Sequence, residues 1–152
     1  MKLKLADKID DYDQLMDQQF NLLQQMIDLS NDIIQQDYQD DELLKKGSGL
    51  LSTMLTLNQI NYHLVENFPD KKEIKFIRDQ YRTFDVGPLD KIKEEINMLN
   101  IHLMELETLK QKMEERDEWE REEELNDIRW IANRNLNEYE TALEDVFKDK
   151  SN

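Results

Sequence analysis

The sequence predicts an all-α protein, an elongated antiparallel helical bundle with coiled-coil character and a long C-terminal helix. Only three glycines and two prolines occur in 152 residues, so turns are few and the elements between them are long. Apolar residues recur at steps of three and four along most of the chain, which is the period of an amphipathic helix. No stretch alternates apolar and polar residues as a half-buried strand does. Hydrophobic residues make up 38% of the chain, which is enough for a buried core in one domain of this length.

Two long helices are expected first, over residues 5–38 and 42–68. Asp40 and Asp41 can cap the start of the second helix. Its interior contains Gly47-Ser48-Gly49, and each glycine costs about 1 kcal/mol relative to alanine. This pattern indicates a kink, a break or the close approach of a neighbouring helix. A phosphate-binding loop is not expected, because its glycine spacing and its preceding strand are missing. The apolar stripe of the first helix is Ile9, Tyr12, Met16, Phe20, Leu23, Met26, Ile27, Ile33 and Ile34.

Proline, glycine and capping residues then predict two further helix boundaries. Pro69 and the capping-box spacing Asp70-x-x-Glu73 predict a short third helix over residues 70–84, with Ile74, Ile77, Tyr81 and Phe84 on its apolar side. Val86-Gly87-Pro88 predicts the next boundary, since glycine can end a helix and proline can open one. The fourth helix is expected over residues 88–113. A later stripe contains Leu125, Ile128, Ala132, Leu136, Tyr139, Leu143 and Val146, so one continuous helix over residues 88–147 is an alternative.

The acidic stretch MEERDEWEREEELND, residues 113–127, holds nine acids, two arginines and one tryptophan. The apolar stripe lapses there for about three turns, so little on that face can be buried. We therefore expect a helical bundle over residues 1–113, an acidic helical spacer over 114–124 and a C-terminal helix or arm over 125–152. The last segment can project, fold back, or pair with a second copy, so a homodimer is one expected state.

Trp119 and Trp130 are eleven residues apart, which is three helical turns, so they share a face. That face is nearly opposite Leu125 and Ile128, and Met98 and Ile101 fall near the same side further back. The first expectation is that both tryptophans pack on another helix of the same chain. The second is a protein interface framed by acids, since tryptophan is enriched at interface hot spots; the third is scattered exposure. For an interface, the candidate partner-binding residues are Glu118, Trp119, Glu122, Glu123 and Trp130.

The sequence holds few residues that could form a catalytic or metal site. His63 and His102 are each followed by a glutamate three residues later, whereas the di-metal helical bundles use the reverse order, Glu-x-x-His. The chain has no cysteine, and neither histidine stands in a triad motif. His63 also falls on the polar side of its helix. We therefore expect no cofactor, no metal site and no enzyme, and a di-metal helical-bundle enzyme is the catalytic alternative.

The net charge of the chain limits the kinds of molecule that it can bind. Twenty basic residues against 35 acidic ones leave a net charge of −15, which repels nucleic acids and anionic membranes. No apolar run is long enough to span a bilayer and no secretory signal is evident, so we expect a cytoplasmic location. The leading expectation is a non-enzymatic helical protein–protein interaction module, an adaptor, scaffold or inhibitor, acting on a basic or nucleic-acid-binding protein. The alternative is an acidic nucleic-acid mimic that inhibits a DNA- or RNA-binding enzyme, as phage-encoded inhibitors do.

Overall fold

The structure is a computed structural model that describes residues 5–81, 85–112, 115 and 117–151, and the side chains of residues 11–139 within those ranges. Its helices are α1 (Leu5–Gln35), α2 (Asp40–Asn67), α3 (Lys72–Gln80), α4 (Pro88–Gln111) and α5 (Glu118–Ser151). The described ranges contain no strand, so the predicted all-α helical bundle is confirmed. None of these helices combines the length and the apolar character that crossing a membrane requires.

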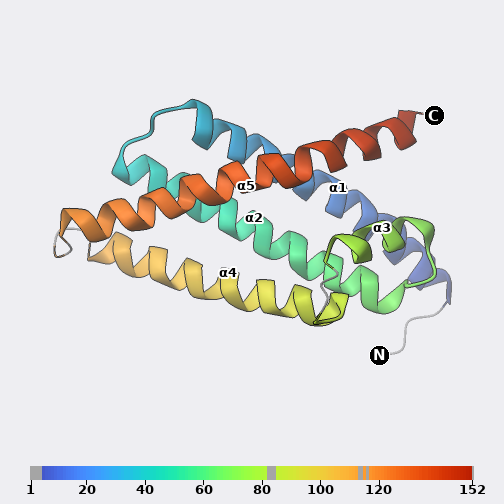
Figure 1. The fold of residues 1–152 in the computed structure, drawn as a ribbon. Coiled ribbons are helices and arrows are strands. Elements are labelled where there is room, and N and C mark those ends of the chain that lie inside the picture. The colour runs from blue at the N-terminus through green and yellow to red at the C-terminus, as the bar shows by residue number, and fades with distance from the viewer. Residues whose placement is uncertain (1–4, 82–84, 113–114, 116, 152) are drawn as a thin grey trace.

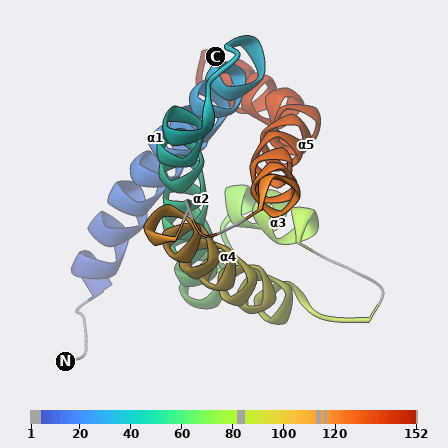
Figure 2. The same cartoon turned by 90° about the vertical axis from the view of Figure 1, so that its left-hand side faces the viewer.

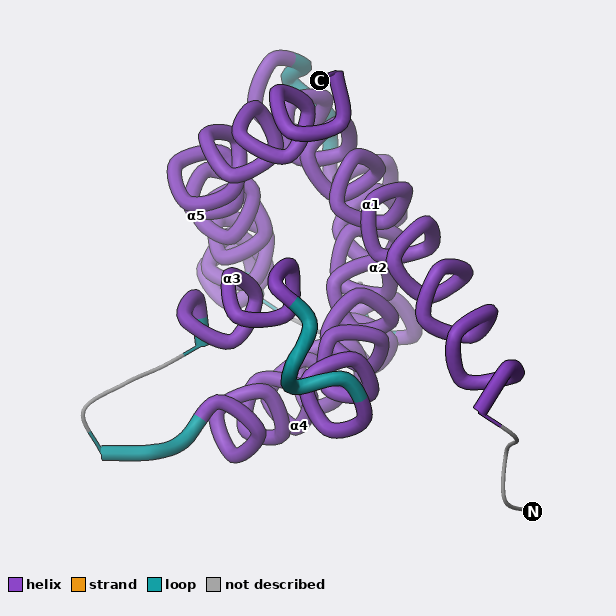
Figure 3. The backbone as a smooth tube through the Cα atoms, turned by 90° about the vertical axis from the view of Figure 1, so that its right-hand side faces the viewer, coloured by secondary structure: helices purple, strands orange, loops and turns teal. Residues whose placement is uncertain are grey.

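The four long helices alternate in direction. α1 and α2 form an antiparallel hairpin, α4 runs back along α2, and α5 runs back along α1 (Figure 1). Seen along the bundle, they follow the order α4, α2, α1, α5 around an arc (Figure 2). α4 and α5 are consecutive in the chain but scarcely pack on each other. The arc is therefore open on the side between α4 and α5, and α3 lies at the end of that side away from the turn that joins them (Figures 1 and 3).

The core consists of two clusters of buried side chains. The first joins α1, α2, α4 and α5, and its members include Met26, Leu50, Leu51, Leu109 and Ile128. The second joins α1, α2, α3 and α4, and its members include Tyr12, Leu64, Ile74, Ile77 and Ile92. α5 thus covers one end of the α1–α2 hairpin and α3 covers the other. Four residues of the predicted stripes lie outside the described side chains: Ile9, Phe84, Leu143 and Val146.

The bundle does not stop near residue 113, as the lapse of the stripe suggested. Leu125, Ile128, Ile131 and Ala132 are buried in the first cluster. The predicted spacer over 114–124 is not one helical segment either, because α5 begins at Glu118 and includes the second half of it. Asp117 directly precedes α5, and its Oδ1 accepts a hydrogen bond from the backbone N–H of Glu120 at 2.9 Å. A single helix over 88–147 is thus excluded, and the C-terminal segment folds back instead of projecting as an arm.

Two of three helix starts differ in their capping from the sequence pattern. The residue before α2 is Gln39, without a side-chain cap, and Asp40 and Asp41 lie in the first turn, where negative charge is favourable. The expected capping box before α3 is absent, since the N-cap is Lys71. Oε2 of Glu73 instead accepts a hydrogen bond from the hydroxyl of Tyr12 on α1, at 2.8 Å. Gly87 precedes Pro88 at the start of α4, as expected.

α2 continues without a break through its two interior glycines. A Cβ added to Gly47 would lie 2.5 Å from Cδ1 of Ile128 on α5, whereas one added to Gly49 would meet nothing within 4 Å. Of the three alternatives for this segment, close approach by a neighbouring helix therefore applies to Gly47. Neither a kink nor a break is needed to explain Gly49, which is exposed.

Candidate functional site

Exposed apolar side chains gather on the two helices that border the open side. The large exposed apolar residues of the described chain are Ile34, Phe76, Met98, Ile101, Met104, Trp119 and Trp130. Five of these seven belong to α4 and α5. Trp119 is 69% exposed and Trp130 62% exposed, so the first expectation, that both pack on another helix of the chain, is wrong.

The predicted partner-binding residues are all exposed, but they do not form one cluster. Successive residues of a helix are rotated by about 100°, which places Glu123 on the same face as Trp119 and Trp130. Glu118 and Glu122 are also exposed but lie on the flank of that face. The opposite face of α5 carries the buried Leu125 and Ile128, as the spacing predicted.

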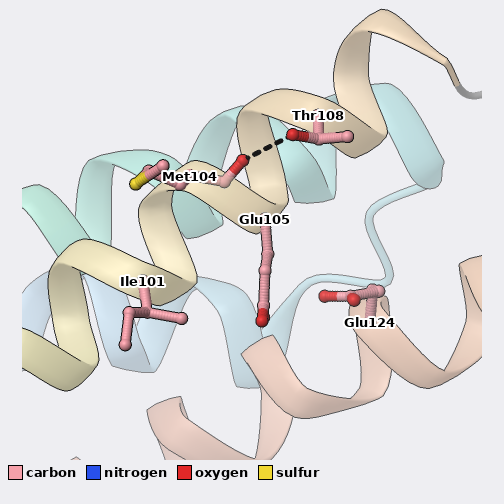
Figure 4. A pocket seen from close by; sticks show the side chains of 5 residues that line it. All are labelled: Ile101, Met104, Glu105, Thr108 and Glu124. Carbon is pink, nitrogen blue, oxygen red and sulfur yellow. Dashed lines mark hydrogen bonds between the residues drawn. The ribbon is translucent and has the colours of Figure 1, made fainter.

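A groove separates α4 from α5. One hollow of about 200 Å³ has walls from both helices and a floor that includes Met54 of α2. A second, more open hollow of about 460 Å³ lies toward the α4–α5 turn and is lined by Ile101, Met104, Glu105, Thr108 and Glu124 (Figure 4). The residues around the first hollow are Met54, Lys91, Glu94, Glu95, Met98, Leu99, His102, Trp130, Ile131 and Arg134. The two hollows lie one after the other along α4 and share no lining residue, and the surface that contains both is named the groove.

The groove carries more negative than positive charge. Glu94, Glu95, Glu105 and Glu124 line it, against Lys91 and Arg134. Glu105 projects from α4 toward α5, and Glu124 of α5 lies opposite it (Figure 4). The guanidinium of Arg134 lies 5.3 Å from the ring centre of Trp130, a cation–π contact within α5.

Glu95 is the half-buried carboxylate of this groove. Burial raises its pKa above the ordinary range, because removal from water disfavours the charged form. Arg134 and Lys91 oppose this rise, whereas the nearby charges of Glu138 and Glu94 add to it. The groove thus contains a carboxylate that a further positive charge would stabilise.

The two histidines stand apart from each other and make simple pairs. His63 on α2 is exposed, as expected, and its Nε2 lies 3.5 Å from Oδ2 of Asp11. His102 on α4 lies 4.0 Å from Oε2 of Glu105. Within the described residues, no three histidine or carboxylate side chains converge as a metal site would require.

Several residues of the groove were not predicted from the sequence as part of a site. The sequence places Met98 and Ile101 near the tryptophan side, but it predicts no role for Met104 or Arg134, and it singles out Glu105 only for its spacing from His102. A signal for the apolar ones exists: Met98, Ile101 and Met104 are spaced by three and lie off the buried stripe of α4. No sequence pattern could have paired α4 with α5 across the groove, because that pairing depends on where α5 folds back.

Neither a family model, nor a curated protein, nor a solved structure matches this chain.

Proposed function

We propose that the protein is a non-enzymatic helical interaction module, of the adaptor, scaffold or inhibitor class, that binds a basic protein. The observation that supports this is the set of exposed apolar side chains on α4 and α5, with two tryptophans among carboxylates. Exposed apolar patches rimmed by polar residues mark protein interaction sites, and tryptophan is enriched among the residues that dominate binding energy.

The charge specifies the kind of partner. The chain carries a net charge of −15, and carboxylates of both helices line the groove. Complementary charge speeds encounter with a basic partner and disfavours like-charged ones. A second copy of the chain would bring the same acids to this surface, so the exposed face of α4 and α5 suits a homodimer poorly.

Capture from an extract of the organism that makes the protein tests this proposal. Wild-type protein is compared with the double variant Trp119→Ala/Trp130→Ala, and Phe76→Ala on α3 serves as the control because Phe76 is also exposed. We expect the wild type and Phe76→Ala to retain the same basic protein and the tryptophan variant to lose it. Equal capture by all three would contradict the proposal.

The nucleic-acid mimic remains the second candidate, since the first turns of α5 present carboxylates at high density. They are Glu118, Glu120, Glu122, Glu123 and Glu124. A mimic should compete with DNA or RNA for its target and lose affinity steeply as salt rises. An interface centred on tryptophan should retain most of its affinity at moderate salt, so a salt titration of the captured complex separates the two candidates.

A further inference from the structure

The groove has the composition of a helix-binding surface. Its floor is apolar, formed by Met54, Leu99 and Ile131 from three different helices, all of them buried. Its borders carry the exposed side chains of Met98 on α4 and Trp130 on α5. An amphipathic helix binds by placing its apolar face in such a groove, and methionine adapts its shape to the side chains that it meets.

The length of the groove sets the length of the ligand. Its lining residues on α4 run from Lys91 to Thr108, which is about 26 Å at 1.5 Å per residue. Those on α5 run from Glu124 to Arg134, which is about 15 Å. A helix of three to five turns would therefore be in contact with both walls. Such a helix would lie along the side of the bundle that α4 and α5 border.

The charges at the borders determine the polar side of that helix. Glu94 and Glu105 are exposed on α4, and Glu124 faces Glu105 across the groove (Figure 4). A lysine or arginine placed there would be attracted to both carboxylates. In the first hollow, burial raises the pKa of Glu95, and a nearby cation would offset that effect.

Other occupants fit these observations less well. Nucleic acid is repelled by the same carboxylates, and a second copy of the chain carries the same net charge of −15. A nucleic-acid mimic would present carboxylates to a basic cleft and would have no use for an apolar floor between two helices.

We infer that the groove between α4 and α5 binds one basic amphipathic helix of the partner, with its apolar face on Met98, Leu99 and Ile131 and its lysines or arginines beside Glu94, Glu105 and Glu124. This inference rests on the proposed function and assigns it a place and a ligand. It moves the main contact from the acidic first turns of α5, which the sequence favoured, to the groove beside them.

Three synthetic peptides of about 18 residues, or five turns, test the inference. The first is a leucine–lysine helix with leucines on one face. The second has the same composition in an order that gives no apolar face, and the third is the first with glutamate in place of lysine. Binding to the full-length protein is measured by fluorescence anisotropy at physiological ionic strength. We expect the first peptide to bind at least about tenfold more tightly than either control.

The variant Met98→Asp separates groove binding from general attraction to an acidic protein. It places a charge in the apolar contact, so binding in the groove should weaken by about tenfold or more. It also makes the protein more acidic, so non-specific attraction of a basic peptide should stay equal or increase. Phe76→Asp adds the same charge at an exposed residue that lines neither hollow and is the matched control.

The possible results separate this inference from the proposed function. Equal binding of the first two peptides, no binding, or unchanged binding to Met98→Asp overturns the groove site. If Met98→Asp still captures the protein partner while Trp119→Ala/Trp130→Ala does not, the proposed function is supported and the groove site is contradicted. If neither variant affects capture, both the groove site and the proposed function are contradicted.

Discussion

Glu95 illustrates at the residue scale how one half-buried carboxylate can lower the stability of the fold. Its pKa is raised by burial, more than Arg134 and Lys91 can compensate. For an acid with a raised pKa, the stabilising contribution is present below the unfolded pKa and is lost as pH rises through the folded pKa. At neutral pH, the charged form of Glu95 therefore destabilises the protein.

We accordingly predict that Glu95→Gln is more stable than the wild type at pH 7, because glutamine resembles the neutral acid. The advantage should disappear as the pH falls below the ordinary range of a glutamate, where Glu95 itself is protonated. Thermal unfolding at both pH values measures the difference. Glu94→Gln, at the exposed neighbouring residue, controls for the change in net charge. A lower unfolding temperature for Glu95→Gln at pH 7 would mean that its attraction to Arg134 outweighs its burial.

Single residues also show what helical periodicity can predict. The spacing of Trp119 and Trp130 correctly placed them opposite Leu125 and Ile128, because the direction of a side chain depends only on the helical repeat. Their burial was predicted wrongly, since periodicity does not reveal whether another element covers a face. Ile34 at the end of α1 shows the same error, because it was placed in the stripe and is 42% exposed.

At the element scale, the contact of α5 with α2 gives a prediction with an internal control. We expect Gly47→Ala to destabilise the protein by about 1–3 kcal/mol, since the new Cβ would collide with Ile128, whose branched side chain has few alternative rotamers. Gly49→Ala should instead stabilise it by up to about 1 kcal/mol, through helix propensity alone. Urea unfolding of the two variants measures both effects. Stabilisation by both substitutions would show that α5 does not lie on α2 at this position.

The helices themselves followed from the sequence more readily than their ends. Long apolar stripes predicted α1, α2 and α4, because burial of a continuous face dominates the stability of a long helix. Capping residues were less informative, since Glu73 binds the hydroxyl of Tyr12 on another helix instead of closing a capping box. A tertiary hydrogen bond of this kind cannot be read from the local spacing of residues.

At the scale of the whole molecule, the fold class was predictable but the path of the C-terminal segment was not. The acidic stretch has few apolar residues; α4 ends just before it and α5 begins within it. Whether the chain then continues, projects or reverses depends on contacts between distant residues, such as Asn135 on α5 with Ser30 on α1, whose side chains are 3.4 Å apart. The groove exists only because of that reversal, so its position could not be predicted either.

The charge of the whole molecule supplies the last prediction, which concerns Glu118, Glu122 and Glu123. Changing all three to lysine should leave thermal stability nearly unchanged, since each side chain is exposed and such charges contribute little to stability. It should slow association with a basic partner and reduce the effect of salt on the rate, because distant charges act mainly on encounter. Trp119→Ala should instead speed dissociation, because contact area is lost after binding. Stopped-flow association and dissociation rates at two salt concentrations distinguish the two effects. If the charge reversal leaves the association rate intact, the acidity of α5 has no part in attracting the partner, and only the apolar contacts of the surface would then account for binding.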